Sequence, residues 1–132
     1  MFYIGDVLDA YYHNNMDVTV DNSTESRKYY EYGDNMLMFT HGDKEKMSDI
    51  PLIMATEMPE MFARCKYREA HLGHFHKEMV NDFRGVKVKI LPSICPHDAW
   101  HKAQGYASFR CAQAHIWSKN KGYKGFMQIN VD

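Results

Sequence analysis

The alternation of apolar and polar residues predicts a chain of short helices and strands. Residues 2–14 place apolar side chains three and four positions apart, which is the spacing of an amphipathic helix. The segments 17–20 (DVTV), 27–32 (RKYYEY) and 36–40 (MLMFT) are typical of strands, and the last two flank a tight turn, GDN. Because "MLMF" is apolar at each position, we expect that strand to be covered on both faces.

The middle of the chain predicts one interrupted helix. Ser48 and Asp49 suit the capping position of a helix that has Pro51 in its first turn. Pro59 is expected to kink or end this helix, because proline cannot donate the intrahelical hydrogen bond. Leu52, Ala55 and Phe62 are expected to share one face of this helix.

The C-terminal half of the chain predicts two hairpins. Residues 79–93 favour two strands around an Arg84-Gly85 turn, and the segments 108–118 and 126–131 favour two more strands. Residues 97–106 are expected to form a short helix or a loop. Many strands with a few helices predict an α+β or layered α/β fold.

Composition narrows the class of protein. The chain has 132 residues with 45% hydrophobic and 25% charged side chains, as a single globular domain does. Its formal net charge of −1 provides no overall attraction to nucleic acid. Cys65, Cys95 and Cys111 are widely spaced and odd in number, which favours reduced thiols in the cytoplasm over disulfides or a cysteine zinc site. No signal peptide and no membrane-spanning apolar run is present in the sequence.

Histidines mark the candidate site. His41 directly follows the predicted strand 36–40, and His74 and His76 follow a later apolar stretch and a glycine within "HLGHFHKE". Ligands gather at the carboxyl ends of strands in layered α/β folds, so these imidazoles are expected to face one cleft. A glycine-led loop lets the two histidines of a His-x-His pair splay toward different ions. Three histidines would make a zinc-like site or, with added aspartates, a two-metal hydrolytic site, whereas surface pairs without a catalytic role are the alternative.

Other polar residues are weaker candidates. Asp43 could orient His41 from behind or cap the following helix. Asp98 and His101 could line the rim of a cleft, although a capped turn with Trp100 buried is the favoured interpretation of that segment. Three other histidines lie in segments that we expect to be structural, so they are not expected to bind a metal: His13, His71 and His115.

The motifs "FTHGD" (39–43) and "GHFH" (73–76) resemble, in their order and spacing, the last two motifs of the calcineurin-like metallophosphoesterases. The resemblance covers nearly the whole chain and is to the C-terminal half of such domains, particularly forms found in phages. It implies an α/β fold that is half of a layered β-sandwich flanked by helices, with a mixed sheet and hairpins.

The resemblance also implies a chemistry. His41 and His74 would bind one metal ion and His76 the other, in a pair of Mn²⁺, Fe or Zn²⁺-like ions. Such ions activate a bridging hydroxide for attack on a phosphate mono- or diester, a substrate class that includes nucleotides and nucleic acids.

The sequence departs from the family in its upstream motifs. Residues before 41 contain neither the Asp-x-His nor the Gly-Asn-His-Asp of the family, and Gly5-Asp6 and Gly33-Asp34 lie in a predicted helix and a turn. We therefore expect residues 1–132 to be a single partial domain that works with an N-terminal partner half or self-associates. The alternatives are a non-catalytic metal-binding or interaction module and, last, a cupin-like oxygenase based on "HFHKE".

Overall fold

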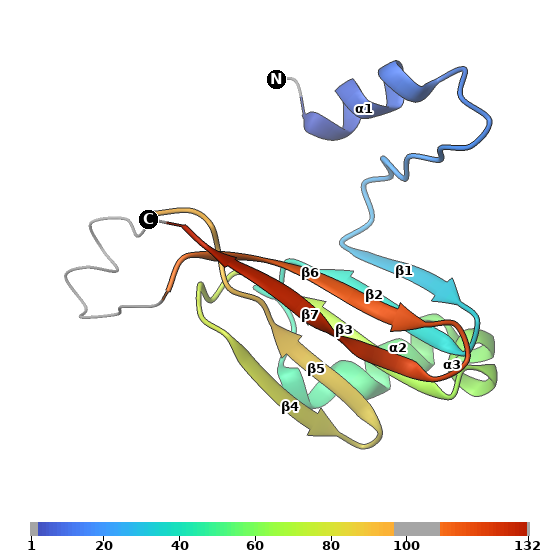
Figure 1. The fold of residues 1–132 in the computed structure, drawn as a ribbon. Coiled ribbons are helices and arrows are strands. Elements are labelled where there is room, and N and C mark those ends of the chain that lie inside the picture. The colour runs from blue at the N-terminus through green and yellow to red at the C-terminus, as the bar shows by residue number, and fades with distance from the viewer. Residues whose placement is uncertain (1–2, 97–108, 132) are drawn as a thin grey trace.

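A five-stranded mixed sheet is the centre of the protein, described here from a computed structural model over residues 3–96 and 109–131. The strands are β1 (Arg27–Tyr32), β2 (Asn35–Thr40), β3 (Tyr67–Leu72), β4 (Met79–Phe83) and β5 (Val86–Ile90). Their order in the sheet is β1-β2-β3-β5-β4 (Figure 1). The three central strands run parallel to one another, and each edge strand joins its neighbour as an antiparallel hairpin.

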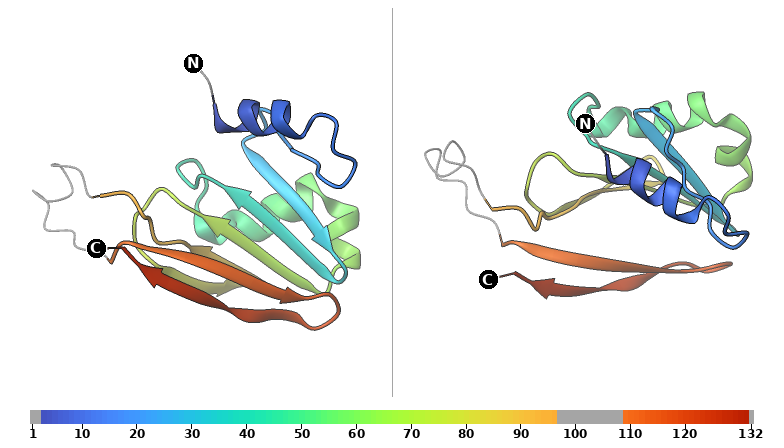
Figure 2. Two further views of the ribbon diagram at one scale, coloured as in Figure 1. Left: turned by 45° about the horizontal axis from the view of Figure 1, so that its top comes forward. Right: turned by 90° about the horizontal axis from the view of Figure 1, so that it is seen from above.

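The two faces of this sheet are covered by different kinds of structure. A 3₁₀ turn (Met47–Asp49), α2 (Ile50–Glu57) and α3 (Pro59–Arg64) form the crossover between β2 and β3 and lie on one face. A separate two-stranded sheet, β6 (Cys111–Ser118) with β7 (Gly122–Asn130), lies on the other face (Figure 2). The described chain is therefore a mixed α/β structure in three layers.

The hydrophobic core lies between the helices and the sheet. Even-numbered residues of β2, β3 and β5 point to this side, because successive side chains of a strand face opposite ways. The fully or almost fully buried members are Met36, Met38, Ile50, Met54, Cys65, Ala70, Leu72, Val86, Val88 and Ile90. Methionines fill much of this core, and their flexible side chains adapt to the gaps between two short helices.

The hairpins predicted from the turn residues are present in the structure. The predicted hairpin at 27–40 and the turn at Arg84-Gly85 are confirmed, with Gly33 and Gly85 both at positive φ. The prediction that "MLMF" is covered on both faces holds for Met36 to Met38, whereas Phe39 is 39% exposed. Pro59 separates α2 from α3, as expected.

One local prediction is wrong, and the face of α2 that carries Leu52 is not its buried face. Residues 17–20 form no strand; they belong to the irregular connection from α1 (Ile4–Tyr12) to β1, where the Asn15 side chain accepts a hydrogen bond from the Asp17 amide. Leu52 is 71% exposed, because Ile50 and Met54, four positions apart, occupy the buried face of α2. Residues two apart on a helix lie on nearly opposite sides, so burial of Met54 turns Leu52 outward.

The N-terminal helix α1 is amphipathic, but its apolar side chains are exposed. It lies beyond the β1 edge of the sheet, apart from α2 and α3 (Figures 1 and 2). Its exposed apolar residues are Ile4, Val7, Leu8 and Tyr11. Within the described ranges, no helix combines the length and the apolar character needed to cross a bilayer.

The packing of α2 makes a direct prediction for stability. Met54→Ala should lower the free energy of unfolding by about 2–5 kcal/mol, because it removes a fully buried side chain from the core. Leu52→Ala on the opposite side of the same helix is the control and should change it by less than about 0.5 kcal/mol. Urea unfolding of both variants tests this, and equal losses would contradict the assigned face.

Candidate functional site

The pairing of β2 with β3 brings two histidine-bearing segments to one edge of the sheet. The strands are parallel and Thr40 is paired with Leu72, so the residues that follow each strand emerge side by side. The Gly73 amide donates a hydrogen bond of 3.0 Å to the His41 carbonyl oxygen and fixes the two chain segments together. This local geometry is the one expected of ligand sites at the carboxyl ends of parallel strands.

His41 and His74 are in direct contact. His41 Nε2 lies 3.2 Å from His74 Nδ1, and the two ring centroids are 5.0 Å apart in an edge-on arrangement. His74 and His76 have positive φ angles of 64° and 53°. A left-handed conformation costs a residue other than glycine about 1–3 kcal/mol, so the loop holds its histidines at an energetic cost. Gly42, at φ 94°, is also required, because a Cβ there would lie 3.1 Å from the Leu72 Cβ.

All three predicted metal ligands line one cavity of about 440 Å³. The remaining wall comes from the segment 91–94, from the start of β6 and from His115. None of the described residues lining this cavity carries a carboxylate. Over the described part of the chain, no three histidine, cysteine, aspartate or glutamate side chains are grouped closely enough to hold an ion. The pair His41–His74 is therefore the preorganised element, and His76 lies on the same cavity wall.

The other predicted candidates lie elsewhere. Asp43 is exposed and, among the described residues, makes no hydrogen bond to His41 and does not line the cavity. Asp98 and His101 lie outside the described residues. Asp49 occupies the capping position of α2 without a side-chain capping hydrogen bond.

The His41–His74 pair fits the geometry of a shared metal ion. Two imidazole nitrogens that each lie 2.0–2.1 Å from a tetrahedral ion are about 3.3 Å apart, close to the 3.2 Å found here. Imidazole nitrogen is a good donor for Zn²⁺, Mn²⁺ and Fe, and a poor one for Mg²⁺ or Ca²⁺. Without an ion, the same distance allows one ring N–H to donate to the other nitrogen.

A buried polar network lies beside this cavity, and the sequence analysis did not predict it. His71 is 3% exposed and its Nε2 lies 3.2 Å from Glu69 Oε2. The same carboxylate accepts a hydrogen bond from Trp117 Nε1 and forms an ion pair with Lys89, both at 3.2 Å. These odd-numbered residues of β3 and β5 face the β6–β7 hairpin, so the network joins the two sheets. The alternation of charged and apolar residues in "REAHL" and "VKVKI" is the only local signal of it.

His115 connects the network to the histidine cavity. Its ring centroid lies 4.9 Å from that of His71, and its Nδ1 is 2.9 Å from the Tyr123 hydroxyl oxygen. Its buried Nε2 has no hydrogen-bond partner within the described residues. Burial lowers the pKa of this imidazole, and the nearby positive charges lower it further, so His115 is a neutral side chain at pH 7.

Burial and pairing compete in the network. Burial raises the pKa of the Glu69 carboxyl, but its contacts with His71 and Lys89 together outweigh burial, and the pKa lies below its ordinary value of 4.5. Desolvation lowers the pKa of the Lys89 ammonium, and the ion pair with Glu69 offsets only part of this effect.

Comparison of the chain with protein-family models, with curated proteins and with solved structures gave no match.

The Glu69 carboxylate predicts an acid-sensitive fold. Because its folded pKa is depressed, Glu69 contributes stability that is fully present above its unfolded value and is lost as the pH falls through the lower folded value. Glu69→Gln should therefore flatten the fall in unfolding free energy between about pH 5 and pH 3. The exposed Glu25→Gln is the control and should retain the wild-type slope. Urea unfolding across this pH range tests it, and an unchanged slope in Glu69→Gln would contradict the assignment.

Proposed function

We propose that this chain carries the histidine ligands of a metal-dependent phosphoesterase site, in which His41 and His74 share one ion. The observation that carries the proposal is the 3.2 Å approach of His41 Nε2 to His74 Nδ1 at the ends of two parallel strands. The order of the motifs "FTHGD" and "GHFH" agrees with it. His74 of this pair and the nearby His76 are both held at positive φ, a backbone cost that a chance meeting of two surface histidines would not require.

His76 is assigned to a second ion. It lies on the wall of the same cavity as the pair, yet the three histidines form no single three-residue group. His74 and His76 each have a left-handed backbone, and only His74 lies in contact with His41. Separate ions therefore suit these two histidines better than one shared ion.

In the proposed hydrolysis the metal ions supply the reactive chemistry, and the chain supplies the ligands that hold them. When bound, such ions supply a hydroxide at neutral pH and stabilise the charge that develops on a phosphate ester. The chain contributes imidazoles at one edge of a sheet, where the Gly73–His41 hydrogen bond joins the two segments that carry them. Metal binding must displace any proton on the coordinating nitrogens, so affinity falls as the pH is lowered.

The described residues that line the cavity supply no carboxylate ligand. Besides glycine, the described lining of the cavity contains only histidine, cysteine, serine, amide and apolar side chains. We propose an N-terminal partner half, or a second chain, as the source of carboxylate ligands. The exposed apolar side chains on the outer face of the β6–β7 hairpin, Ile116, Met127 and Ile129, give such a partner a surface on which to pack.

A non-catalytic metal-binding module is the second candidate, and the carboxylate-free wall of the cavity favours it. In that case the pair His41–His74 holds one structural ion, and His76 has no part in hydrolysis. The two candidates differ in metal stoichiometry and in the response to a partner half.

Complementation tests the proposed activity. Hydrolysis of bis(p-nitrophenyl) phosphate with Mn²⁺ should be slow for the chain alone. It should rise by about tenfold or more when a segment bearing the Asp-x-His and Gly-Asn-His-Asp motifs is added, because preorganised ligands complete the site. His76→Ala should abolish the gain, whereas His13→Ala, on an exposed residue remote from the cavity, should retain it. If the hydrolysis rate does not rise on complementation, or rises equally in His76→Ala, the phosphoesterase proposal is contradicted. The non-catalytic module is then the better account.

A further inference from the structure

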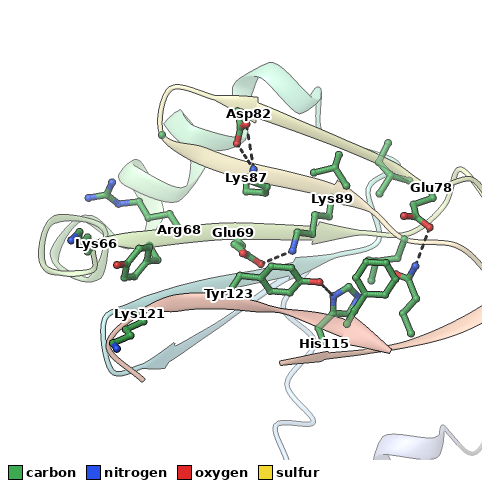
Figure 3. A pocket seen from close by; sticks show the side chains of 17 residues that line it. Lys66, Arg68, Glu69, Glu78, Asp82, Lys87, Lys89, His115, Lys121 and Tyr123 are labelled. Carbon is green, nitrogen blue, oxygen red and sulfur yellow. Dashed lines mark hydrogen bonds and ion pairs between the residues drawn. The ribbon is translucent and has the colours of Figure 1, made fainter. Parts of the chain in front are cut away.

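A second cavity, of about 570 Å³, lies between the inner face of the β6–β7 hairpin and the strands β3, β5 and β4 (Figure 3). Its volume is within the range of small-molecule sites, about 300–1,000 Å³. Most of this cavity is separate from the histidine cavity, but Leu91, Gln113 and His115 line both. The proposed phosphoesterase activity makes no use of the rest of its lining.

Positive charge gathers at one end of this cavity. Lys66 precedes β3 and Lys121 lies in the β6–β7 turn, so the two lysines reach the same end from different sheets (Figure 3). Neither ammonium makes a hydrogen bond or ion pair with another described residue. Lys87, further along β5, is paired with Asp82 at 3.1 Å. Two uncompensated ammonium groups on facing walls favour an anionic ligand between them.

A third cation is built into the wall. Lys89 is 5% exposed, and its Nζ lies 3.2 Å from Glu69 Oε2 and 3.1 Å from the ring centroid of Tyr123. No acceptor among the described residues meets hydrogen-bond geometry with this ammonium. A buried ion pair contributes little stability compared with apolar residues of similar volume. Lys89 therefore adds a positive charge to the cavity wall, where Glu69 is its ion-pair partner.

The other part of the lining suits a planar ring. Phe126 of β7 is 46% exposed, and its ring centroid lies 5.6 Å from that of His115, its partner in the ladder. Apolar side chains of Val80 and Leu91 contribute to the wall on the opposite sheet. An aromatic base can stack on such side chains, each stack contributing about 1–3 kcal/mol.

We propose that this cavity binds a nucleoside polyphosphate, with the base near His115 and Phe126 and the phosphates between Lys66 and Lys121. From His115, β6 continues for three residues to Ser118, about 10 Å at 3.3 Å per residue, and Lys121 lies in the turn beyond it, so inorganic phosphate is too short to contact both ends. A nucleoside carrying two or three phosphates has both the ring and the extended negative charge. This inference goes beyond the proposed phosphoesterase activity and does not depend on it.

The test is an NMR titration of the ¹⁵N-labelled chain with ATP, in buffer containing EDTA so that no metal occupies the histidine cavity. ATP should shift the amides of β3, β5 and the β6–β7 hairpin. The variant Lys66→Ala/Lys121→Ala should bind ATP about tenfold more weakly, a loss of ~1.4 kcal/mol, and should bind adenosine as the wild type does. Lys124→Ala is the matched control, since Lys124 lies on the same hairpin outside the cavity lining.

Two further variants distinguish this cavity from the histidine cavity and test whether the nucleoside base contacts Phe126. Phe126→Ala should weaken both ATP and adenosine, whereas His41→Ala should bind ATP with wild-type affinity, even though it disables the proposed metal pair. The inference is overturned if ATP shifts only amides near the histidine cavity, that is, residues 41–76 without those of β3. It is overturned as well if ATP does not bind at millimolar concentration. It is also overturned if the double lysine variant and Lys124→Ala bind ATP equally well, or if tripolyphosphate binds as tightly as ATP.

Discussion

The parallel pairing of β2 with β3 is the constraint on which the rest of the structure depends. Parallel neighbours need a crossover connection, and the segment from the 3₁₀ turn through α3 supplies it and buries one face of the sheet. The same pairing places His41 beside the 73–78 loop, because Thr40 and Leu72 end their strands at the same level. Without this register the two imidazoles would not meet.

The two faces of the five-stranded sheet differ chemically: one is apolar and forms the core, and the other is polar and faces the β6–β7 hairpin. On the helix side, even-numbered residues of the central strands form a methionine-rich apolar core. On the hairpin side, odd-numbered residues bring Glu69, His71, Lys87 and Lys89 into or beside the interface between the sheets. Burying a carboxylate and an ammonium there has a desolvation cost that pairing only partly offsets. Two adjoining cavities lie on this side of the sheet, and they share Leu91, Gln113 and His115.

Sequence patterns predicted what depends on near neighbours. The hairpins followed from turn residues such as Gly33 and Gly85, whose positive φ angles suit glycine. The meeting of His41 and His74 followed from a rule about strand ends, which needs only that the two strands are parallel neighbours. The strand at 17–20 was wrong, because a strand needs a partner. Which face of the short helix α2 is buried depends on the sheet that it covers.

The features that the sequence did not predict depend on contacts between residues that are far apart in the chain. His115 was predicted to be structural, and its place on both cavities comes from the packing of the β6–β7 hairpin over β3 and β5. The Glu69–Lys89 pair joins two strands whose connection includes a hairpin, and Trp117 reaches it from 48 residues away. The alternating charges in these strands indicated a polar face, but no local pattern said what covers it. The long-range register of the two sheets decides that.

The most direct measurement of the central claim is the ¹⁵N spectrum of the histidine side chains during titration with Zn²⁺. We expect one equivalent to shift His41 Nε2 and His74 Nδ1 together toward values of metal-bound nitrogen, while the ring nitrogens of the buried His71 keep their positions. The account is contradicted if these two nitrogens do not respond, or if the first equivalent acts on His13 instead.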